Sequence, residues 1–185
     1  MNRRPQRQPH DFTLLYLFSY DAEVVRNPTL LSSEIGQFRS FFVTGTFSNL
    51  YNVYGDVTTP GLGYQAITGR LDWGNDQALI GNDDIARGDI RATIVTDDHA
   101  TIDLRYRIVG YLGAGGGRRL IDGQKNDQFG NEDYPFEAPF TTSPRFETAD
   151  PKYRWLNELQ GIGFGKFQLI RNEFRRVTCD VYALT

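Results

Sequence analysis

This chain has 185 residues, 23% of them charged, and a net charge of −3, so it is long enough for one domain with a sizeable core. The mild acidity gives no electrostatic reason to expect a nucleic-acid partner. No apolar run approaches the roughly 20 residues of a membrane span, and the polar start lacks the apolar core of a secretory signal. We therefore expect a cytoplasmic protein with no nucleic-acid or membrane partner.

The first eleven residues form a polar segment, in which Arg3, Arg4 and Arg7 stand among proline and glutamine. Such a segment has too few apolar side chains to offset the entropy lost on ordering. The sequence predicts a disordered lead-in over residues 1–11 and a single β-barrel domain over residues 12–185.

Strand patterns dominate the rest of the chain. Every second residue from Phe12 to Tyr20 is apolar or aromatic, and Val177, Cys179, Val181 and Ala183 form a similar stripe near the end. Short helical pieces are expected near Thr29–Ile35 and Lys152–Leu159. Strands are predicted near residues 12–20, 38–48, 51–58, 64–72, 89–97, 100–111, 134–141, 161–171 and 173–184.

The order of these elements predicts an all-β fold, since hairpin-sized links join the strands and long helical patterns are missing. We expect an antiparallel up-and-down β-barrel of about eight to ten strands with one or two short helices. The interior of an eight-stranded barrel is just wide enough for packed side chains or one small ligand. The architecture therefore indicates a pocket in the lumen.

Several common chemistries lack their residues in this sequence. The two histidines are His10, in the polar lead-in, and His99, in a tight turn, so neither a histidine-based triad nor a histidine-rich metal site is expected. The glycine cluster at residues 113–117 matches neither the P-loop nor the dinucleotide spacing. We expect no cofactor and no metal ion.

The hairpin at residues 89–110 carries alternating charges, and the length of its loop decides where they point. A three-residue loop, Asp97–His99, places Arg91 opposite Arg105 on a polar outer face. A two-residue loop, Asp98 and His99, places Arg91 opposite Tyr106 in an apolar wall, as in a ligand site. We favour the two-residue loop because histidine tolerates the positive φ angle that such a turn requires.

Carboxylates, arginines and aromatic hydroxyls remain as candidates for chemistry. Asp72 precedes Trp73 at the expected end of a strand, where a nearby ring can raise the pKa of the carboxyl and make it a general base. Alternatively, Asp72 caps a turn. Asp89 and Arg91 can pair to orient a polar substrate group, or form a plain surface pair. Tyr51 can donate a hydrogen bond to a ligand, or serve as ordinary strand filler.

The order of several short motifs resembles the domain-of-unknown-function 3237 family from about residue 12 to the end. The chain departs from the pattern at Arg70 and Leu71, at His99, and in its long insert between residues 113 and 133. The motifs are Gly36-Gln37-Phe38-Arg39 with Gly45, Gly69-Arg70-Leu71-Asp72-Trp73, Asp89-Ile90-Arg91, Thr96-Asp97-Asp98-His99-Ala100-Thr101-Ile102, Tyr134, Phe146-Glu147-Thr148 and Tyr153-Arg154-Trp155-Leu156-Asn157.

The resemblance implies a small barrel with a lumen pocket, and a divergent member similar to those of fungal natural-product pathways, in which cofactor-free cyclisation or isomerisation has been proposed. It adds Arg39 and Trp155 to the expected substrate-binding residues, which are Arg39, Tyr51, Trp73, Asp89, Tyr106 and Trp155. Asp72 and Arg91 are the expected catalytic pair.

Two functions follow from these residues. The first is a cofactor-independent cyclase or isomerase that folds a hydrophobic or aromatic small molecule and moves a proton. The second is a non-catalytic binding or carrier barrel that uses the same pocket. A homodimer is compatible with an aromatic-rich small barrel.

Overall fold

The structure is a computed structural model, and it describes residues 12–33, 36–48, 67–117, 136–170 and 173–184. Side chains are described within these ranges except at residues 23–33, 36–48, 136, 169–170 and 173–175. The lead-in expected over residues 1–11 and the strand expected over 51–58 lie outside the described residues.

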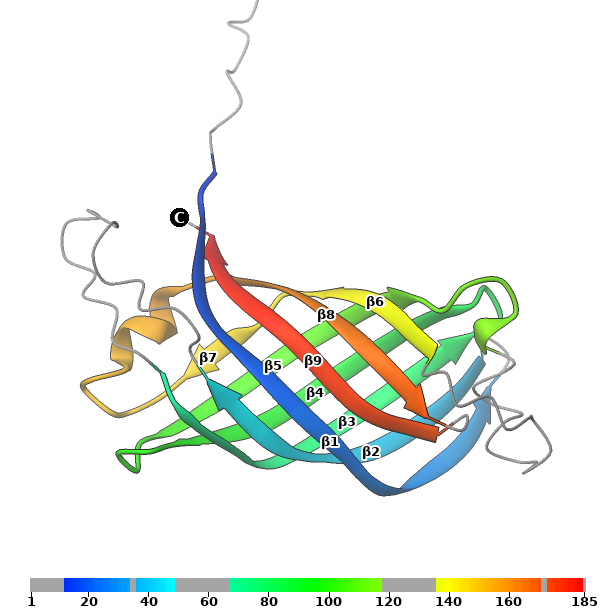
Figure 1. Cartoon of the computed structure of the whole chain (residues 1–185), viewed down its shortest axis with the longest axis horizontal. Helices are drawn as coiled ribbons and strands as arrows, with labels where there is room; N and C mark the ends of the chain where they lie inside the picture. Colours follow the sequence, from blue (N-terminus) through cyan, green and yellow to red (C-terminus); the bar gives the residue numbers. More distant parts are fainter. Residues whose placement is uncertain (1–11, 34–35, 49–66, 118–135, 171–172, 185) are drawn as a thin grey trace, which may run out of the picture.

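Nine antiparallel strands and one short 3-10 helix make up the described chain (Figure 1). The strands are β1 (Leu14–Ser33), β2 (Gly36–Ser48), β3 (Gly69–Gly81), β4 (Ile85–Thr96), β5 (Thr101–Tyr111), β6 (Phe136–Thr142), β7 (Arg145–Glu147), β8 (Gly161–Ile170) and β9 (Glu173–Leu184), and the 3-10 helix is η1 (Arg154–Glu158).

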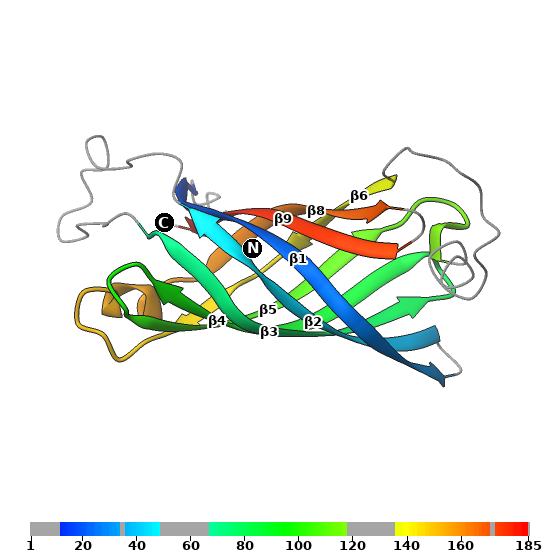
Figure 2. The same ribbon diagram turned by 60° about the horizontal axis from the view of Figure 1, so that its bottom comes forward.

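The pairings of these strands close into a ring, which confirms the predicted up-and-down barrel. Neighbours follow the order β1, β2, β3, β4, β5, β6, β8, β9, and β9 pairs back to β1. The short β7 pairs with β5 at residues 103–105, whereas β6 pairs with β5 at residues 108–110, so β6 and β7 share one place in the ring. Figure 2 shows β1, β9 and β8 on one side of the barrel and β3, β4 and β5 on the other.

The alternation of apolar residues explains which side chains fill the barrel. In β4 every second residue is buried, whereas the residues between them are exposed or half-buried. The buried residues from Ala86 onward include Gly88, Ile90, Ala92 and Ile94. Because successive side chains on a strand point to opposite faces, the buried set lines the interior. Apolar side chains from β1, β3 and β5 to β9 join it in one continuous core.

The β4–β5 hairpin has the three-residue loop, so the predicted two-residue register is wrong. Arg91 pairs with Arg105, and it is Ile90 that pairs with Tyr106. The backbone of Thr96 and Ala100 closes the loop with an N···O distance of 2.9 Å, and His99 has a φ of 69°. Both the three-residue and the two-residue loop need a residue with a positive φ angle. The ability of histidine to adopt that angle therefore could not distinguish the two loop lengths.

The two short helical pieces expected from the sequence have different outcomes. The 3-10 helix η1 confirms the second piece, near Lys152–Leu159. The first piece, Thr29–Ile35, is wrong because β1 continues as a strand to Ser33. Pairing with β2 extends to Ser33, so the hydrogen-bonded ladder overrides the local sequence preference. Within the part of the chain that the structure describes, no helix is long and apolar enough to cross a membrane.

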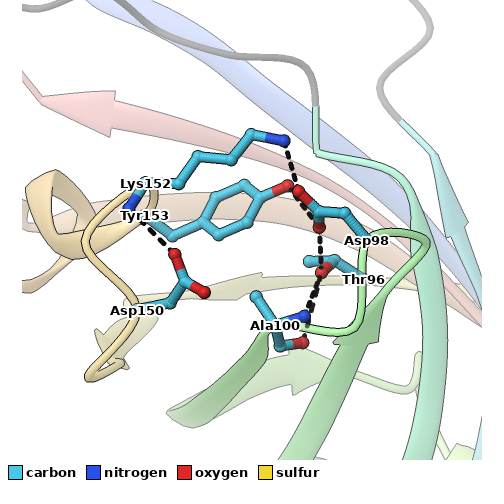
Figure 3. Close-up of polar contacts among 6 residues, drawn as sticks. All are labelled: Thr96, Asp98, Ala100, Asp150, Lys152 and Tyr153. Atoms are coloured by element: carbon cyan, nitrogen blue, oxygen red, sulfur yellow. Dashed lines mark hydrogen bonds and ion pairs between the residues drawn. The ribbon is translucent and has the colours of Figure 1, made fainter.

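A polar network joins the tip of the β4–β5 hairpin to the segment that precedes η1 (Figure 3). Tyr153 donates a hydrogen bond to Asp98 Oδ1 at 3.0 Å, and the Lys152 ammonium forms an ion pair with the same carboxylate. The amide of Ala100 donates to Thr96 Oγ1 at 2.8 Å, which fixes the loop that presents Asp98. The network therefore holds one end of the barrel together.

Candidate functional site in the barrel lumen

Asp76 is a carboxylate inside the barrel. It lies in the middle of β3, in phase with Ala78 and Ile80, and only 4% of its surface is exposed. Among the described residues, no donor reaches Asp76 Oδ1 within hydrogen-bond distance. An ionised carboxyl in such a place is costly, so its presence requires an explanation.

Two tyrosine hydroxyls meet across the lumen near this carboxyl. Tyr20 of β1 donates a hydrogen bond to Tyr106 of β5 at 2.8 Å, although β1 and β5 stand four places apart in the ring. Tyr106 and Asp76 both pair with Ile90, so they occupy one row across β3, β4 and β5. Cys179 lies beside Tyr20 in the neighbouring strand β9.

A small cavity of about 10 Å³ lies between these groups. This volume is close to the least that one water molecule needs. The rings of Phe140 and Phe167, with centroids 4.5 Å apart, close part of its wall. The cavity is lined by Tyr20, Asp76, Ile90, Tyr106, Ile108, Phe140, Phe167 and Val177.

Burial changes the acidity of every titratable group in this cluster. It raises the pKa of the Asp76 carboxyl to about 7, and the nearby charge of Asp89 adds to the effect. It also raises the pKa of the Cys179 thiol to about 12 and the pKa values of Tyr20 and Tyr106 well above their usual range. At neutral pH the thiol and both phenols keep their protons, and Asp76 is divided between its two forms.

This arrangement is suited to proton transfer. A carboxyl whose pKa lies near the working pH can both take and return a proton. Since Tyr106 accepts the bond from Tyr20, its own hydroxyl proton is available to a group in the cavity. The described residues contain no group of three or more His, Cys, Asp or Glu side chains arranged to hold a metal ion.

Four of the residues expected at the site lie on the outer face of the barrel. Asp72 is exposed and pairs with Arg70 at 2.9 Å, and Trp73 is 48% exposed. Asp89 and Arg91 are exposed on β4, and Asp89 lies 3.8 Å from Arg107. The placement predicted for these residues, at the mouth or wall of the lumen, is therefore wrong.

The other expected residues are distributed differently. Tyr106 lines the lumen cavity, as predicted. Trp155 belongs to η1 and packs against the core at the end of the barrel. The backbone of Arg39 pairs with Ala78 in β3, but its side chain lies outside the described residues, as does all of Tyr51.

Sequence reasoning missed Asp76 because it ended the strand at Asp72. Gly74 and Asn75 favour turns, and they suggested that the chain reverses there. In the structure the ladder with β4 continues on both sides of them, from Gly69 to Ile80. Asp76, Ala78 and Ile80 are at every second position, so a strand through them places all three on one face. A carboxylate on that apolar face is the sequence signal that would have identified Asp76.

Solved structures of other proteins share this fold. A conserved protein of unknown function from Rhodopseudomonas palustris has 20% identity and a TM-score of 0.70, over 96% of this chain and 100% of its own. A β-barrel-like protein from Acinetobacter baumannii has 24% identity and a TM-score of 0.64, over 97% of this chain and 100% of its own. An enzyme from the fungus Penicillium herquei has 14% identity and a TM-score of 0.53, with both chains fully covered.

No curated protein matches the sequence. The family described as "Protein of unknown function (DUF3237)" matches residues 13–184. That range takes in all nine strands of the barrel. The chain therefore belongs to the DUF3237 family, and its fold is similar to that of the fungal enzyme.

Proposed function

We propose that this protein is a cofactor-independent cyclase or isomerase of specialised, natural-product metabolism, which acts on a hydrophobic or aromatic small molecule in the barrel lumen. The observation that supports it is the Asp76 carboxyl, whose Oδ1 is buried without a hydrogen-bond donor among the described residues. Buried carboxyls with a pKa near 7 are concentrated at functional sites. Asp76 takes the role of acid and base that the sequence suggested for Asp72.

The chemistry is a proton transfer within one molecule. Asp76 takes a proton from an acidic O–H or C–H group of the substrate and returns a proton to another atom of that molecule. The hydroxyl of Tyr106, oriented by Tyr20, donates to the oxygen on which negative charge develops. Because no atom is gained or lost overall, the product has the mass of the substrate.

The lining of the cavity limits the substrate class. The described residues that line it include one carboxyl and no cationic side chain. An anionic substrate would be repelled by the Asp76 carboxylate, whereas a neutral molecule with an O–H donor gives Oδ1 the partner it lacks. Apolar and aromatic walls favour a ring-bearing substrate, and folding it in place can supply roughly 7–11 kcal/mol of barrier reduction.

The size of the cavity adds a requirement. About 10 Å³ accommodates no such substrate, so binding needs side chains in the wall to turn. The rings of Phe140 and Phe167 border the cavity and are the groups whose movement would widen it. Substrate binding and widening of the cavity are then coupled, because the bound substrate replaces the packing contacts that the two rings lose when they turn.

A non-catalytic carrier is the alternative that the same observation supports, since Asp76 Oδ1 can accept a hydrogen bond from a ligand as well as a proton. Wild type, Asp76→Asn and the control Asp72→Asn are incubated with a metabolite extract of the source organism without added cofactor, and mass spectrometry follows the compounds. We expect one compound to decrease and another of identical mass to increase with wild type and Asp72→Asn, but not with Asp76→Asn.

The other outcomes separate the two functions. A compound that binds, survives unchanged and is released on denaturation would favour the carrier. Conversion that continues in Asp76→Asn would contradict the assignment of the acid–base group. Neither conversion nor binding by the wild type would contradict both functions.

A further inference from the structure

Thr142 is a second polar residue inside the barrel whose side chain has an unpartnered oxygen. It lies at the end of β6, in phase with the buried Ala138 and Phe140, so its side chain points into the lumen. Only 8% of its surface is exposed, and no hydrogen-bond partner among the described residues reaches Thr142 Oγ1. A buried hydroxyl of this kind destabilises a protein, because it loses its hydrogen bonds to water and gains none in return.

The methyl group of Thr142 is closely packed, in contrast to its hydroxyl. Thr142 pairs with Gly163 of β8, where a β-carbon would overlap with Thr142 Cγ2 and would stand 2.9 Å from Cys179 Sγ. The methyl group therefore fills space that the missing side chain at position 163 leaves open. A valine would make the same methyl contact without an unpaired hydroxyl, so packing alone does not explain a threonine at this position.

Ile108 of β5 lies between Thr142 and Asp76 in the lumen wall. It pairs with Thr142 on one side and with Gly88 on the other. A β-carbon on Gly88 would stand 2.6 Å from Ile108 Cγ1 and 2.9 Å from Asp76 Oδ1, so the isoleucine and the carboxyl meet over this glycine. The two unpartnered oxygens thus lie on either side of one apolar side chain.

The small lumen cavity ends just short of Thr142. Ile108, its cross-strand partner, and Phe140, two residues earlier on the same face of β6, both line the cavity. Phe140 is one of the two rings whose turning would widen the cavity for a substrate. A cavity widened at Phe140 extends along β6 toward Thr142, so the Asp76 carboxyl and the Thr142 hydroxyl would then border one space.

We propose that Thr142 is a second anchor for the substrate, whose hydroxyl donates a hydrogen bond to an acceptor oxygen of the molecule that Asp76 binds through an O–H group. This inference rests on the proposed function of the lumen. It narrows the substrate class to a neutral, ring-bearing compound with a hydroxyl at one position and a carbonyl or ether oxygen at another. Two contacts fix the direction in which such a molecule lies, and that direction decides which of its atoms faces Asp76.

Three variants test the anchor, and their stabilities are first compared without a ligand. Thr142→Val removes the hydroxyl and keeps the methyl group, Thr142→Ser does the reverse, and Thr141→Val is the matched control at the exposed neighbouring position of β6. We expect Thr142→Val to raise the melting temperature by about 2–4 °C, because the unpaired hydroxyl is gone. Thr142→Ser should lower it, and Thr141→Val should change it little. A melting temperature of Thr142→Val at or below that of the wild type would overturn the proposal.

Isothermal titration calorimetry then measures the binding of meta- and para-hydroxyacetophenone, which carry a hydroxyl and a carbonyl on one ring. The matching ethylphenols, in which a methylene group replaces the carbonyl, are the control compounds. We expect Thr142→Val to lose about tenfold in affinity for the hydroxyacetophenones and none for the ethylphenols. Thr142→Ser and Thr141→Val should bind both kinds of compound as the wild type does. The change that stabilises the free protein thus weakens binding, which a purely structural threonine would not cause.

The remaining outcomes separate this inference from the proposed function. If Asp76→Ala abolishes binding of the hydroxyacetophenones but Thr142→Val leaves it unchanged, the anchor is overturned and the proposed function stands. Equal losses of affinity for the hydroxyacetophenones and the ethylphenols in Thr142→Val would assign Thr142 to the packing of the lumen and would also overturn the anchor. A wild type that binds none of these phenols would contradict both the anchor and the substrate class proposed for the lumen.

Discussion

The carboxyl of Asp76 in β3 occupies the space that a side chain on Gly88 of β4 would need. A β-carbon on Gly88 would stand 2.9 Å from Asp76 Oδ1 and 2.6 Å from Ile108 Cγ1. The absence of a side chain at position 88 thus lets a carboxyl and an isoleucine pack against the strand backbone. Gly88 therefore provides the space in which the Asp76 carboxyl packs inside the barrel.

Replacing this glycine should disturb the lumen. We expect Gly88→Ala to lower the free energy of unfolding by about 1–3 kcal/mol, since the added methyl group overpacks the interior. In an Asp76→Ala background the loss should be smaller, because one of the two clashing groups is gone. Urea denaturation of the four proteins of this cycle measures the coupling, and strict additivity would contradict the contact.

The raised pKa of Asp76 predicts how stability changes with pH. The folded protein holds a proton on Asp76 up to about pH 7, whereas the unfolded chain releases it near 3.8. The folded state therefore binds more protons between these values, and Asp76 lowers the free energy of unfolding as the pH rises through that window. Above pH 7, where Asp76 is ionised in both states, the free energy of unfolding is lower by roughly 4 kcal/mol than it is below pH 3.8.

Asp76→Asn removes this dependence. Urea denaturation between pH 4 and 8 should show that the variant gains stability relative to the wild type as the pH rises, by up to the same roughly 4 kcal/mol. Asp72→Asn, at an exposed position, is the control. Parallel pH profiles for wild type and Asp76→Asn would show that Asp76 titrates normally.

The register of the β4–β5 hairpin predicts a small effect at Arg91. Because Arg91 lies opposite Arg105 on the outer face, Arg91→Glu exchanges a like-charge pair for an opposite-charge pair. We expect a gain of a few tenths of a kcal/mol in the free energy of unfolding. A loss above about 1 kcal/mol would instead place Arg91 against the core.

The network at the end of the barrel predicts a loss that depends on acid. The hydrogen bond from Lys152, followed by those from Thr96 and Tyr153, lowers the pKa of Asp98 below its usual range. Such a carboxylate stabilises the fold above its unfolded pKa, and the effect is lost as the pH falls through the folded pKa. Lys152→Met should therefore be less stable at pH 7, and the deficit should shrink below about pH 4. A deficit unchanged at low pH would exclude the ion pair as its cause.

The architecture was predictable because it depends on local alternation. Apolar stripes such as that of Val177, Cys179, Val181 and Ala183 identify strands whatever their partners, and short links leave few topologies. The stripe from Phe12 to Tyr20 also marks a strand, but a register shift between Tyr16 and Phe18 leaves Leu14 exposed and Tyr20 buried. The motifs of the DUF3237 family pointed to the same barrel. Individual strand ends were harder to place, since β1 and β3 continue through residues that favour helix or turn when considered alone.

The candidate site was harder to predict because it depends on register. A change of one residue in the hairpin loop separates the two placements of Arg91, and both loops accept His99. Asp76 was missed because Gly74 and Asn75 favour turns. In the structure both pair with β4, and Asn75 also pairs with Phe42 of β2. The Tyr20–Tyr106 bond joins opposite walls of the closed ring, and no local pattern reports such a contact.

We propose that Asp76 is a lumen carboxyl that exchanges a proton near neutral pH. An NMR titration of the aspartate side-chain carboxyl carbons in wild type and Asp76→Asn tests it most directly. We predict one carboxyl with a midpoint near pH 7 in the wild type, and its absence from the variant. A wild type in which every aspartate titrates below about pH 5 would contradict the claim.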